Sequence, residues 1–258
     1  MEIKDSHIMI TGSNRGIGRA VAMSCAADKA HLHLVNRSLD EDLNAELTKS
    51  GAASITNYLL NLNSAIEIQK FIEANKNLSL DILFNNAGQL TGGLLEEQNI
   101  NDINSMLQVN VNALIHLTHG FLPGMLKRKH GKIINHSSVS AIMHFPCAST
   151  YAASKAAVYA FTQCLRAELK GTGVTTLTLI TPGVETRMYA DISNKYGKNM
   201  DLSFLKSMPV KQYAQRIREA ILEDLEELQP SGVSGLSVKF AQFFPFAFEK
   251  LAVKSFKR

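Results

Sequence analysis

Short apolar runs alternate along the chain with longer stretches in which apolar and polar residues recur at helical spacing. Runs of the first kind predict strands, and stretches of the second kind predict helices. The predicted strands are residues 7–10, 31–35, 53–60, 82–84, 132–135 and 174–180. The predicted helices are residues 18–28, 41–49, 64–75, 101–122 and 151–169.

Strands that alternate with helices of this length indicate βαβ units, whose parallel strands are covered by helices on both faces. We therefore expect an α/β fold, a Rossmann-type doubly wound parallel sheet in a three-layer α/β/α arrangement. The 258 residues contain no linker that would divide them, so residues 1–258 are predicted to form a single domain. In such sheets the ligand binds beyond the carboxyl ends of the strands.

The composition narrows the class of protein. Apolar residues make up 45% of the chain and charged residues 19%, as is typical of a packed globular domain. A net charge of +4 is too small to indicate a partner that is a nucleic acid. Cys25, Cys147 and Cys164 lack the spacing of metal ligands, so we expect no metal site and a reducing, cytoplasmic compartment. The sequence shows no signal peptide and no apolar run long enough to span a membrane.

The segment TGSNRGIG, residues 11–18, follows the first predicted strand and leads into the first predicted helix. Gly12 allows a tight turn, Gly16 lets a pyrophosphate approach the backbone, and Gly18 lets the helix pack closely on the strand. The helix N-terminus offers unpaired N–H groups to phosphates. A loop that only reverses the chain would look similar, but the position between strand and helix favours a dinucleotide site.

The end of the second predicted strand indicates which dinucleotide binds. NAD-binding sites usually carry an acidic residue there, whereas an arginine can hold the 2′-phosphate of NADP. Asn36 and Arg37 occupy this position, and Arg15 in the glycine loop can supply a second positive charge. The alternative is that both arginines are solvated surface residues. We interpret the pattern as a site for NADP(H) rather than NAD(H).

Tyr151 and Lys155 are four residues apart in a predicted helix and therefore lie on one face of it. A free tyrosine has a pKa near ~10 and is a poor acid–base catalyst at neutral pH. We expect the Lys155 ammonium, together with a cationic nicotinamide ring, to lower this pKa toward the working range. Ser138 lies 13 residues before Tyr151 and can donate a hydrogen bond to a substrate carbonyl oxygen.

These motifs closely resemble the short-chain dehydrogenase/reductase family over roughly residues 5–190. TGSNRGIG matches the glycine loop of that family, NNAG at 85–88 matches its motif after the fourth strand, and PG at 182–183 matches its motif after the sixth. The resemblance implies a catalytic tetrad of Asn110, Ser138, Tyr151 and Lys155. It also implies a set of cofactor-binding residues: Gly12, Ser13, Asn14, Arg15, Gly16, Ile17, Gly18, Asn36, Arg37, Asn61, Leu62, Asn86, Ala87, Gly88, Tyr151, Lys155, Pro182, Gly183, Val184 and Thr186.

The chain departs from the family pattern at two positions. Asn61 stands where family members commonly have an aspartate near the adenine, and we expect a modest effect on cofactor affinity. The segment PGVET, residues 182–186, is one residue shorter than the common form of this motif in the family. Thr186 is therefore matched to the threonine of the family, which lies one residue further along.

The resemblance implies an oxidoreductase that interconverts a carbonyl and an alcohol by hydride transfer, with Tyr151 as the acid/base. Lys155 would bind the nicotinamide ribose, and Asn110 would hold a water that connects Lys155 to solvent. A small lipophilic ketone, a sterol or a retinoid competes as substrate with a 3-oxoacyl thioester. A nucleotide-sensing binding protein without turnover is the alternative of another class, which the intact tetrad disfavours. Family members often pair through the helices at 101–122 and 151–169, so we expect a homo-oligomer, a dimer or a tetramer.

The last part of the chain bears on the substrate. Residues 187–230 are in the place where the family usually has a substrate lid, and their methionines and aromatics suggest an apolar pocket wall or ordinary packing. Residues 236–258 contain six of the 12 phenylalanines, five Lys/Arg and one Glu, in a predicted helix pair broken at Pro245. Three interpretations stay open for this tail: peripheral contact with an anionic membrane surface, a cap over the substrate cleft, or a subunit contact.

Several other polar residues have simpler interpretations. His31 and His33 fit the alternation of a strand, and residues 223–227 (EDLEE) are most simply a solvated helix face. His136 and His144 lie near Ser138 in the sequence and either line the substrate pocket or are merely solvated.

Overall fold

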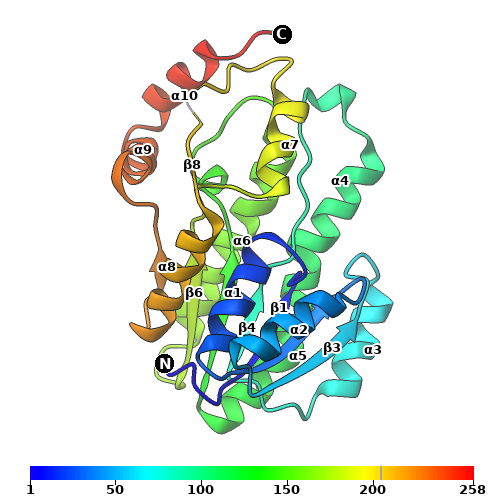
Figure 1. The fold of residues 1–258 in the computed structure, drawn as a ribbon. Helices are drawn as coiled ribbons and strands as arrows, with labels where there is room; N and C mark the ends of the chain where they lie inside the picture. Colours follow the sequence, from blue (N-terminus) through cyan, green and yellow to red (C-terminus); the bar gives the residue numbers. More distant parts are fainter. Residues whose placement is uncertain (204) are drawn as a thin grey trace.

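Seven parallel strands form the central sheet in the part of the chain that the structure describes, residues 1–203 and 205–258 (Figure 1). In this computed structural model their order is β3-β2-β1-β4-β5-β6-β9. The strands are β1 (His7–Thr11), β2 (His31–Asn36), β3 (Ser54–Leu59), β4 (Ile82–Asn85), β5 (Gly131–His136), β6 (Val174–Leu179) and β9 (Glu227–Leu228). This arrangement confirms the predicted Rossmann-type sheet and adds the short last strand to it.

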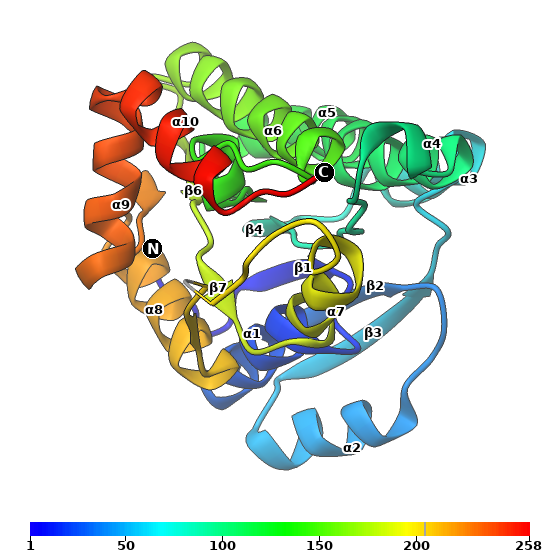
Figure 2. The ribbon, with the colours of Figure 1, turned by 90° about the horizontal axis from the view of Figure 1, so that it is seen from above.

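Helices cover both faces of the sheet and complete the three predicted layers (Figures 1 and 2). The first face is covered by α1 (Gly16–Ala27), α2 (Glu41–Ser50) and α8 (Val210–Leu222). The second face is covered by α3 (Ala65–Asn75), α5 (Ala113–Arg128) and α6 (Ser149–Glu168), and α4 (Ile100–Leu107) continues this layer.

Successive strand residues point to opposite faces of the sheet and enter two separate hydrophobic clusters. In β1, Ile8 and Ile10 join the cluster under α1 and α8, whereas Met9 joins the cluster under α5. In β4, Phe84 joins the first of these clusters and Leu83 joins the second. Because both faces are buried, these strands are read in the sequence as continuous apolar runs.

The order of the strands reverses between β1 and β4. β2 lies on one side of β1 and β4 on the other, where Ile10 pairs with Phe84. The connections after β1 and β4 therefore leave in opposite directions, and doubly wound sheets bind their ligands in the crevice that opens there.

The predicted helix over residues 101–122 is interrupted. α4 ends at Leu107, Gln108–Asn112 form a π-helix, and α5 then continues to Arg128. Single π-turns inside helices are rare and occur frequently at functional sites. This correction matters for the site because the interruption contains Asn110. No glycine or proline within the interruption could have indicated it in the sequence.

Residues 223–227 do not form a helix face, although residues 223–226 are exposed to solvent as predicted. α8 ends at Leu222, Asp224 adopts a left-handed φ of 53°, and Glu227 begins β9 beside β6. The Asp224 carboxylate pairs at 2.6 Å with the ammonium of Lys132, a β5 side chain that is fully buried. This ion pair between a buried lysine and a half-exposed aspartate fixes the turn at the edge of the sheet.

The range 187–230, expected to be a substrate lid, contains two different parts. α7 (Arg187–Tyr196) and β8 (Ser207–Met208), which pairs with β7 (Gly183–Val184), lie above the carboxyl ends of the strands (Figure 2). α8 instead belongs to the helical layer on the sheet. Residue 204 of this range lies outside the described residues.

The predicted C-terminal helix pair is present as α9 (Gly232–Phe243) and α10 (Pro245–Lys254). Pro245 is at the start of α10, where its missing N–H is not needed by the helix. Among the described residues, no helix combines the length and the hydrophobicity that a membrane span requires.

We expect Asp224→Asn to lower the free energy of unfolding by about 1 kcal/mol at pH 7, because the buried Lys132 ammonium loses a counter-charge that solvent already screens in part. Burial acts to raise the pKa of Asp224, but the hydrogen bond and charge of Lys132 outweigh it and hold that pKa below its ordinary 3.8. The stabilisation is therefore present above this ordinary pKa and disappears as the pH falls through the lower pKa of the folded state. Denaturant unfolding at pH 7 and in acid measures both effects.

Glu223→Gln is the matched control, since this exposed neighbour is in none of the ion pairs of the described residues. An equal loss of stability in the two variants would show that the ion pair has no special effect.

Candidate active site

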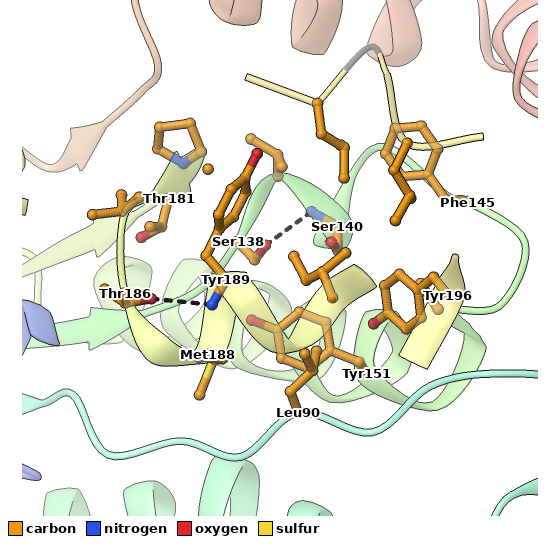
Figure 3. A pocket seen from close by; sticks show the side chains of 18 of the residues that line it. Leu90, Ser138, Ser140, Phe145, Tyr151, Thr181, Thr186, Met188, Tyr189 and Tyr196 are labelled. Atoms are coloured by element: carbon orange, nitrogen blue, oxygen red, sulfur yellow. Dashed lines mark hydrogen bonds between the residues drawn. The ribbon is translucent and has the colours of Figure 1, made fainter. Parts of the chain in front are cut away.

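An apolar cavity of about 160 Å³ lies above the carboxyl ends of β5 and β6 (Figure 3). Its walls come from α7, from the segment after β5 and from the connection between β4 and α4. The apolar and aromatic lining residues include Leu90, Phe145, Met188, Ile192, Met200 and Leu202. Ser138 and Tyr151 place hydroxyl groups in the wall, so one part of this cavity can hold a polar atom of a largely apolar molecule.

Ser138 follows β5, and Tyr151 is in the first turn of α6, so two elements bring the hydroxyls together. Ser138 Oγ accepts a hydrogen bond from the backbone N of Ser140 at 3.1 Å, which fixes the serine at the start of a short 3₁₀ turn. Burial raises the pKa of Tyr151 to about 12, and a side-chain hydrogen bond with Ser138 acts against this rise.

Lys155 lies one turn after Tyr151 and is 4% exposed. Its Nζ donates to the backbone O of His136 at 2.8 Å and lies 5.7 Å from the centre of the Tyr151 ring. Burial lowers the pKa of Lys155 to about 8. Burial of the phenol is the largest effect on Tyr151 and keeps it protonated at neutral pH. The expectation that Lys155 and a cationic nicotinamide together lower this pKa stays a prediction.

Asn110 reaches the same end of the site from the π-helix. Its Oδ1 accepts from the backbone N of Gln89 at 2.7 Å, and its Nδ2 donates to the backbone O of Gln89 and to Ser154 Oγ at 3.0 and 3.1 Å. A Cβ at Gly88 would lie 3.4 Å from Asn110 Oδ1 and 3.8 Å from Lys155 Nζ. Both polar groups therefore lie next to Gly88, and a larger residue there would crowd them.

The histidines divide into buried and solvated groups. His136 lines the cavity, and burial, followed by the charge of Lys155, lowers its pKa to about 3, so its ring is neutral at physiological pH. His144 is exposed and is not among the lining residues of the described cavity, which corresponds to the solvated alternative. His33 is buried in β2 and stacks on His7, as expected of a strand residue.

The glycine loop is in close backbone contact with the segment after β4. Gly12 has a φ of 68°, and a Cβ at Gly18 would lie 2.3 Å from the backbone O of Gly12. Asn86 Nδ2 donates to the backbone O of Thr11 at 2.8 Å and to that of Gly12 at 3.1 Å. Arg15 is the N-cap residue of α1 and makes no side-chain cap in the described structure, so this helix end keeps its affinity for anions.

The side chain of Asn36 is hydrogen-bonded to the glycine loop. Its Nδ2 donates to Ser13 Oγ at 2.8 Å, and its Oδ1 accepts from the backbone N of Asn14 at 3.3 Å. Arg15 and Arg37 are both exposed, and neither is in an ion pair of the described residues. Arg19, by contrast, is held by Asp40 and Glu46 at 3.0 and 2.9 Å. Two cationic groups are thus left facing solvent around a loop that carries no carboxylate.

The other predicted cofactor residues lie around the same crevice. Ile17, Pro182, Gly183, Val184 and Thr186 line the cavity. Thr186 Oγ1 accepts from the backbone N of Tyr189 at 3.2 Å and caps α7, and a Cβ at Gly16 would lie 3.3 Å from its methyl group. Asn61 is exposed and caps its own turn at Asn63 N, while Leu62 is buried in the core.

Comparison with known proteins decides the family. Residues 6–197 match the sequence family described as short chain dehydrogenase. The chain belongs to the short-chain dehydrogenase family. It is therefore an oxidoreductase that acts on CH–OH or C=O groups with a nicotinamide cofactor, NAD or NADP.

Individual relatives of this short-chain dehydrogenase cover most of its length. It is 32% identical over 242 residues to an uncharacterized oxidoreductase of Staphylococcus saprophyticus, which covers 92% of this chain and 96% of that one. It is 33% identical over 194 residues to a fatty acyl-CoA reductase of Acinetobacter baylyi, which covers 73% of this chain and 65% of that one. A solved short-chain dehydrogenase of Streptomyces avermitilis has the same fold, with a TM-score of 0.78 at 20% identity over 97% of this chain and 96% of that one.

Sequence reasoning missed how this short-chain dehydrogenase closes its cavity. Tyr196 on α7 is buried, and its hydroxyl donates to the backbone O of Thr91 at 3.1 Å. Its ring lies where a side chain at residue 92 would be, since a Cβ at Gly92 would lie 1.7 Å from the Tyr196 Cε1. The glycine pair at 92–93 signals a close approach, but nothing in the sequence identifies the ring that makes it.

The end of the tail packs against residues of the cavity wall. Met200 forms an isolated antiparallel bridge with Phe256, and Phe256 packs against the cluster of Cys147, Ala148, Tyr196 and Met200. The interpretation of the tail as a cap over the cleft therefore fits its last residues, while α9 and α10 need a separate account.

We expect Lys155→Met to raise the free energy of unfolding by about 1–2 kcal/mol at pH 7. Because burial lowers the Lys155 pKa from 10.5 to about 8, the unfolded chain binds this proton more tightly than the folded chain does. The charged form therefore destabilises the folded state, and this effect disappears as the pH rises from about 8 to 10.5. The lost hydrogen bond to the His136 carbonyl offsets part of the gain.

Chemical unfolding between pH 7 and the alkaline range measures this difference. Lys170→Met, at an exposed lysine just beyond α6, should show no such dependence on pH. A Lys155→Met protein that is less stable than the wild type at pH 7 would contradict the expected cost of the buried ammonium.

Proposed function

We propose that this protein is an NADP(H)-dependent oxidoreductase that interconverts a carbonyl and an alcohol on a lipophilic substrate. Its catalytic residues are Asn110, Ser138, Tyr151 and Lys155. The observation that carries this proposal is an apolar cavity with the hydroxyls of both Ser138 and Tyr151 in its wall.

The residues around the glycine loop fit a dinucleotide. A Cβ at Gly12 would lie 3.1 Å from the Ala87 Cα, so the glycine keeps open a cradle that a larger residue would fill. The N-terminus of α1 has no side-chain cap from its N-cap residue, which suits a pyrophosphate. Arg15 and Arg37 are exposed cations, and Asn36 stands where NAD sites usually have a carboxylate. These features favour a 2′-phosphate and hence NADP(H).

The nicotinamide supplies or accepts the hydride when it is bound. Ser138 holds the carbonyl oxygen of the substrate by a hydrogen bond, and Tyr151 donates its proton to that oxygen as negative charge develops. A Tyr151 pKa of about 12 keeps the proton on the phenol at neutral pH, which suits the reducing direction. Alcohol oxidation needs the phenolate, which a positive charge beside the ring would favour.

Lys155 and Asn110 support the proton transfer. The carbonyl of His136 holds Lys155 Nζ beside Gly88, where the ammonium can bind ribose hydroxyls and return a proton to Tyr151. Asn110 is fixed on Gln89 by two hydrogen bonds, which supports a role in holding a water between Lys155 and solvent.

The apolar lining supports a lipophilic substrate, as does the likeness to a relative named fatty acyl-CoA reductase. A 3-oxoacyl thioester remains the alternative substrate, and a nucleotide-sensing protein without turnover remains the alternative of another class. A screen of lipophilic ketones and aldehydes against 3-oxoacyl thioesters, followed by NADPH absorbance, separates all three. The proposal includes a cytoplasmic homo-oligomer, a dimer or a tetramer, without a nucleic-acid partner.

We expect Tyr151→Phe to lower kcat at least a hundredfold while the NADPH dissociation constant changes by less than about threefold, because only the proton donor is removed. Tyr159→Phe, two turns further along α6, is the matched control and should keep its activity. Stopped assays measure turnover, and fluorescence titration measures NADPH binding. Substantial reductase activity in Tyr151→Phe would overturn the assignment of the acid.

We expect the double variant Arg15→Ala/Arg37→Asp to lose at least a tenfold preference for NADPH over NADH, since each charged hydrogen bond contributes about 1.5–3 kcal/mol. Lys49→Asp/Lys70→Ala makes the same change of net charge at exposed lysines of α2 and α3 and controls for long-range electrostatics. Isothermal titration with both cofactors measures the preference. A wild-type protein that binds NADH as tightly as NADPH would refute the interpretation of Asn36 and Arg37.

A further inference from the structure

α9 and α10 present a group of large apolar side chains to solvent. Phe243, Phe244 and Phe246 at the junction of the two helices are 75%, 60% and 81% exposed. Other exposed apolar residues on the same helices are Val233, Leu236, Phe240, Leu251 and Val253. We call these eight residues the Phe-rich face. Large apolar side chains exposed together in this way mark interaction sites in soluble proteins.

The two helices are docked by their inner sides, so the Phe-rich face has a fixed orientation. α9 buries Gly235, Val238 and Ala241, and α10 buries Ala252. A Cβ at Gly235 would lie 2.5 Å from the backbone O of Pro230, which means that the helix approaches this segment as closely as a glycine allows. The phenylalanines therefore point outward because small residues occupy the inward positions.

Positive charge accompanies the Phe-rich face. Lys239, Lys250 and Lys254 are exposed on the same helices, and none of them is in an ion pair of the described residues. The acidic residue of these helices is Glu249. Aromatic side chains beside unpaired lysines match an anionic interface, where rings enter the acyl boundary and ammonium groups contact the headgroups.

The Phe-rich face continues into the wall of the cavity. The Phe248 ring of α10 packs on the cavity residue Phe145 with ring centres 5.4 Å apart. After α10, Asp201 N donates to the backbone O of Ser255 at 2.8 Å, and Lys257 N donates to the backbone O of Asn199 at 2.7 Å. In Figure 2 the red C-terminal segment accordingly passes from α10 toward the yellow α7 region above the sheet.

We propose that the Phe-rich face binds an anionic lipid surface and thereby places the cavity next to the membrane from which a lipophilic substrate enters. The part about substrate entry rests on the proposed function, whereas lipid binding does not. A second copy of the chain is a less suitable occupant, because a two-fold contact would bring the same lysines of both copies together.

The test is co-sedimentation of the full chain with vesicles of phosphatidylcholine alone and of phosphatidylcholine with phosphatidylglycerol. We expect binding to the anionic vesicles that weakens as salt rises and little binding to the neutral ones. Phe243→Ser/Phe244→Ser/Phe246→Ser should weaken binding at least tenfold at every salt concentration. Lys239→Gln/Lys250→Gln/Lys254→Gln should weaken it at least tenfold at low salt only.

The matched control replaces three apolar residues elsewhere that are equally exposed: Leu59→Ser/Ile66→Ser/Ile100→Ser, at 62%, 68% and 64%. This variant should bind vesicles as the wild type does. NADPH affinity and circular dichroism establish that each variant is folded.

Two results would overturn the inference. One is a full-length, folded protein that ignores anionic vesicles at low salt. The other is light scattering in which the triple phenylalanine variant converts an oligomer to a smaller species while vesicle binding is unchanged, which would make the Phe-rich face a contact between copies. A turnover assay without vesicles keeps the two proposals separate. A wild-type protein that reduces no lipophilic ketone or aldehyde in this assay would refute the proposed function, and this result would leave the vesicle binding unaffected.

Discussion

The site depends on the hydrogen bonds that join the segments after β1 and β4. Thr11 Oγ1 accepts from the backbone N of Asn86 and of Ala87 at 3.0 and 2.9 Å, and Asn86 donates back to the Thr11 carbonyl. The Oδ1 of Asn86 also lies 3.1 Å from His136 Nδ1. Asn86 thus links the ends of β1, β4 and β5. It positions both the glycine loop and the His136 residue whose carbonyl holds Lys155.

Burial shifts the proton affinities of neighbouring groups in opposite directions. It raises the Tyr151 pKa to about 12 and lowers those of Lys155 and His136 to about 8 and 3. At neutral pH the site accordingly contains a protonated phenol, a neutral imidazole and an ammonium that loses its proton easily. Because the pKa of Lys155 is lower than that of Tyr151, its ammonium can return a proton to a Tyr151 phenolate. A polarised site of this kind follows from packing polar residues under an apolar cavity.

Most of the fold and the members of the candidate site could be predicted from the sequence, because both are encoded locally. Apolar runs in β1 and β4 identify buried strands, and Gly12 and Tyr151 belong to short motifs. The interruption around Asn110 could not be predicted, since it contains no glycine or proline that would break a helix. The contact of Tyr196 with Gly92 joins segments more than a hundred residues apart, and no spacing rule reaches that far. The high pKa of Tyr151 comes from its burial, which depends on residues distant in the sequence.

The position of the Tyr196 ring has a consequence for timing. A molecule that enters or leaves past α7 must first displace a buried aromatic ring that is also hydrogen-bonded to Thr91. Withdrawal of such a ring both exposes apolar surface and breaks a hydrogen bond. It is therefore slow compared with the rotation of a free side chain. In enzymes with closures of this kind, opening and release often limit the steady rate while chemistry is faster. For a molecule that takes this path, a first turnover faster than later ones is the kinetic sign of the ring moving aside.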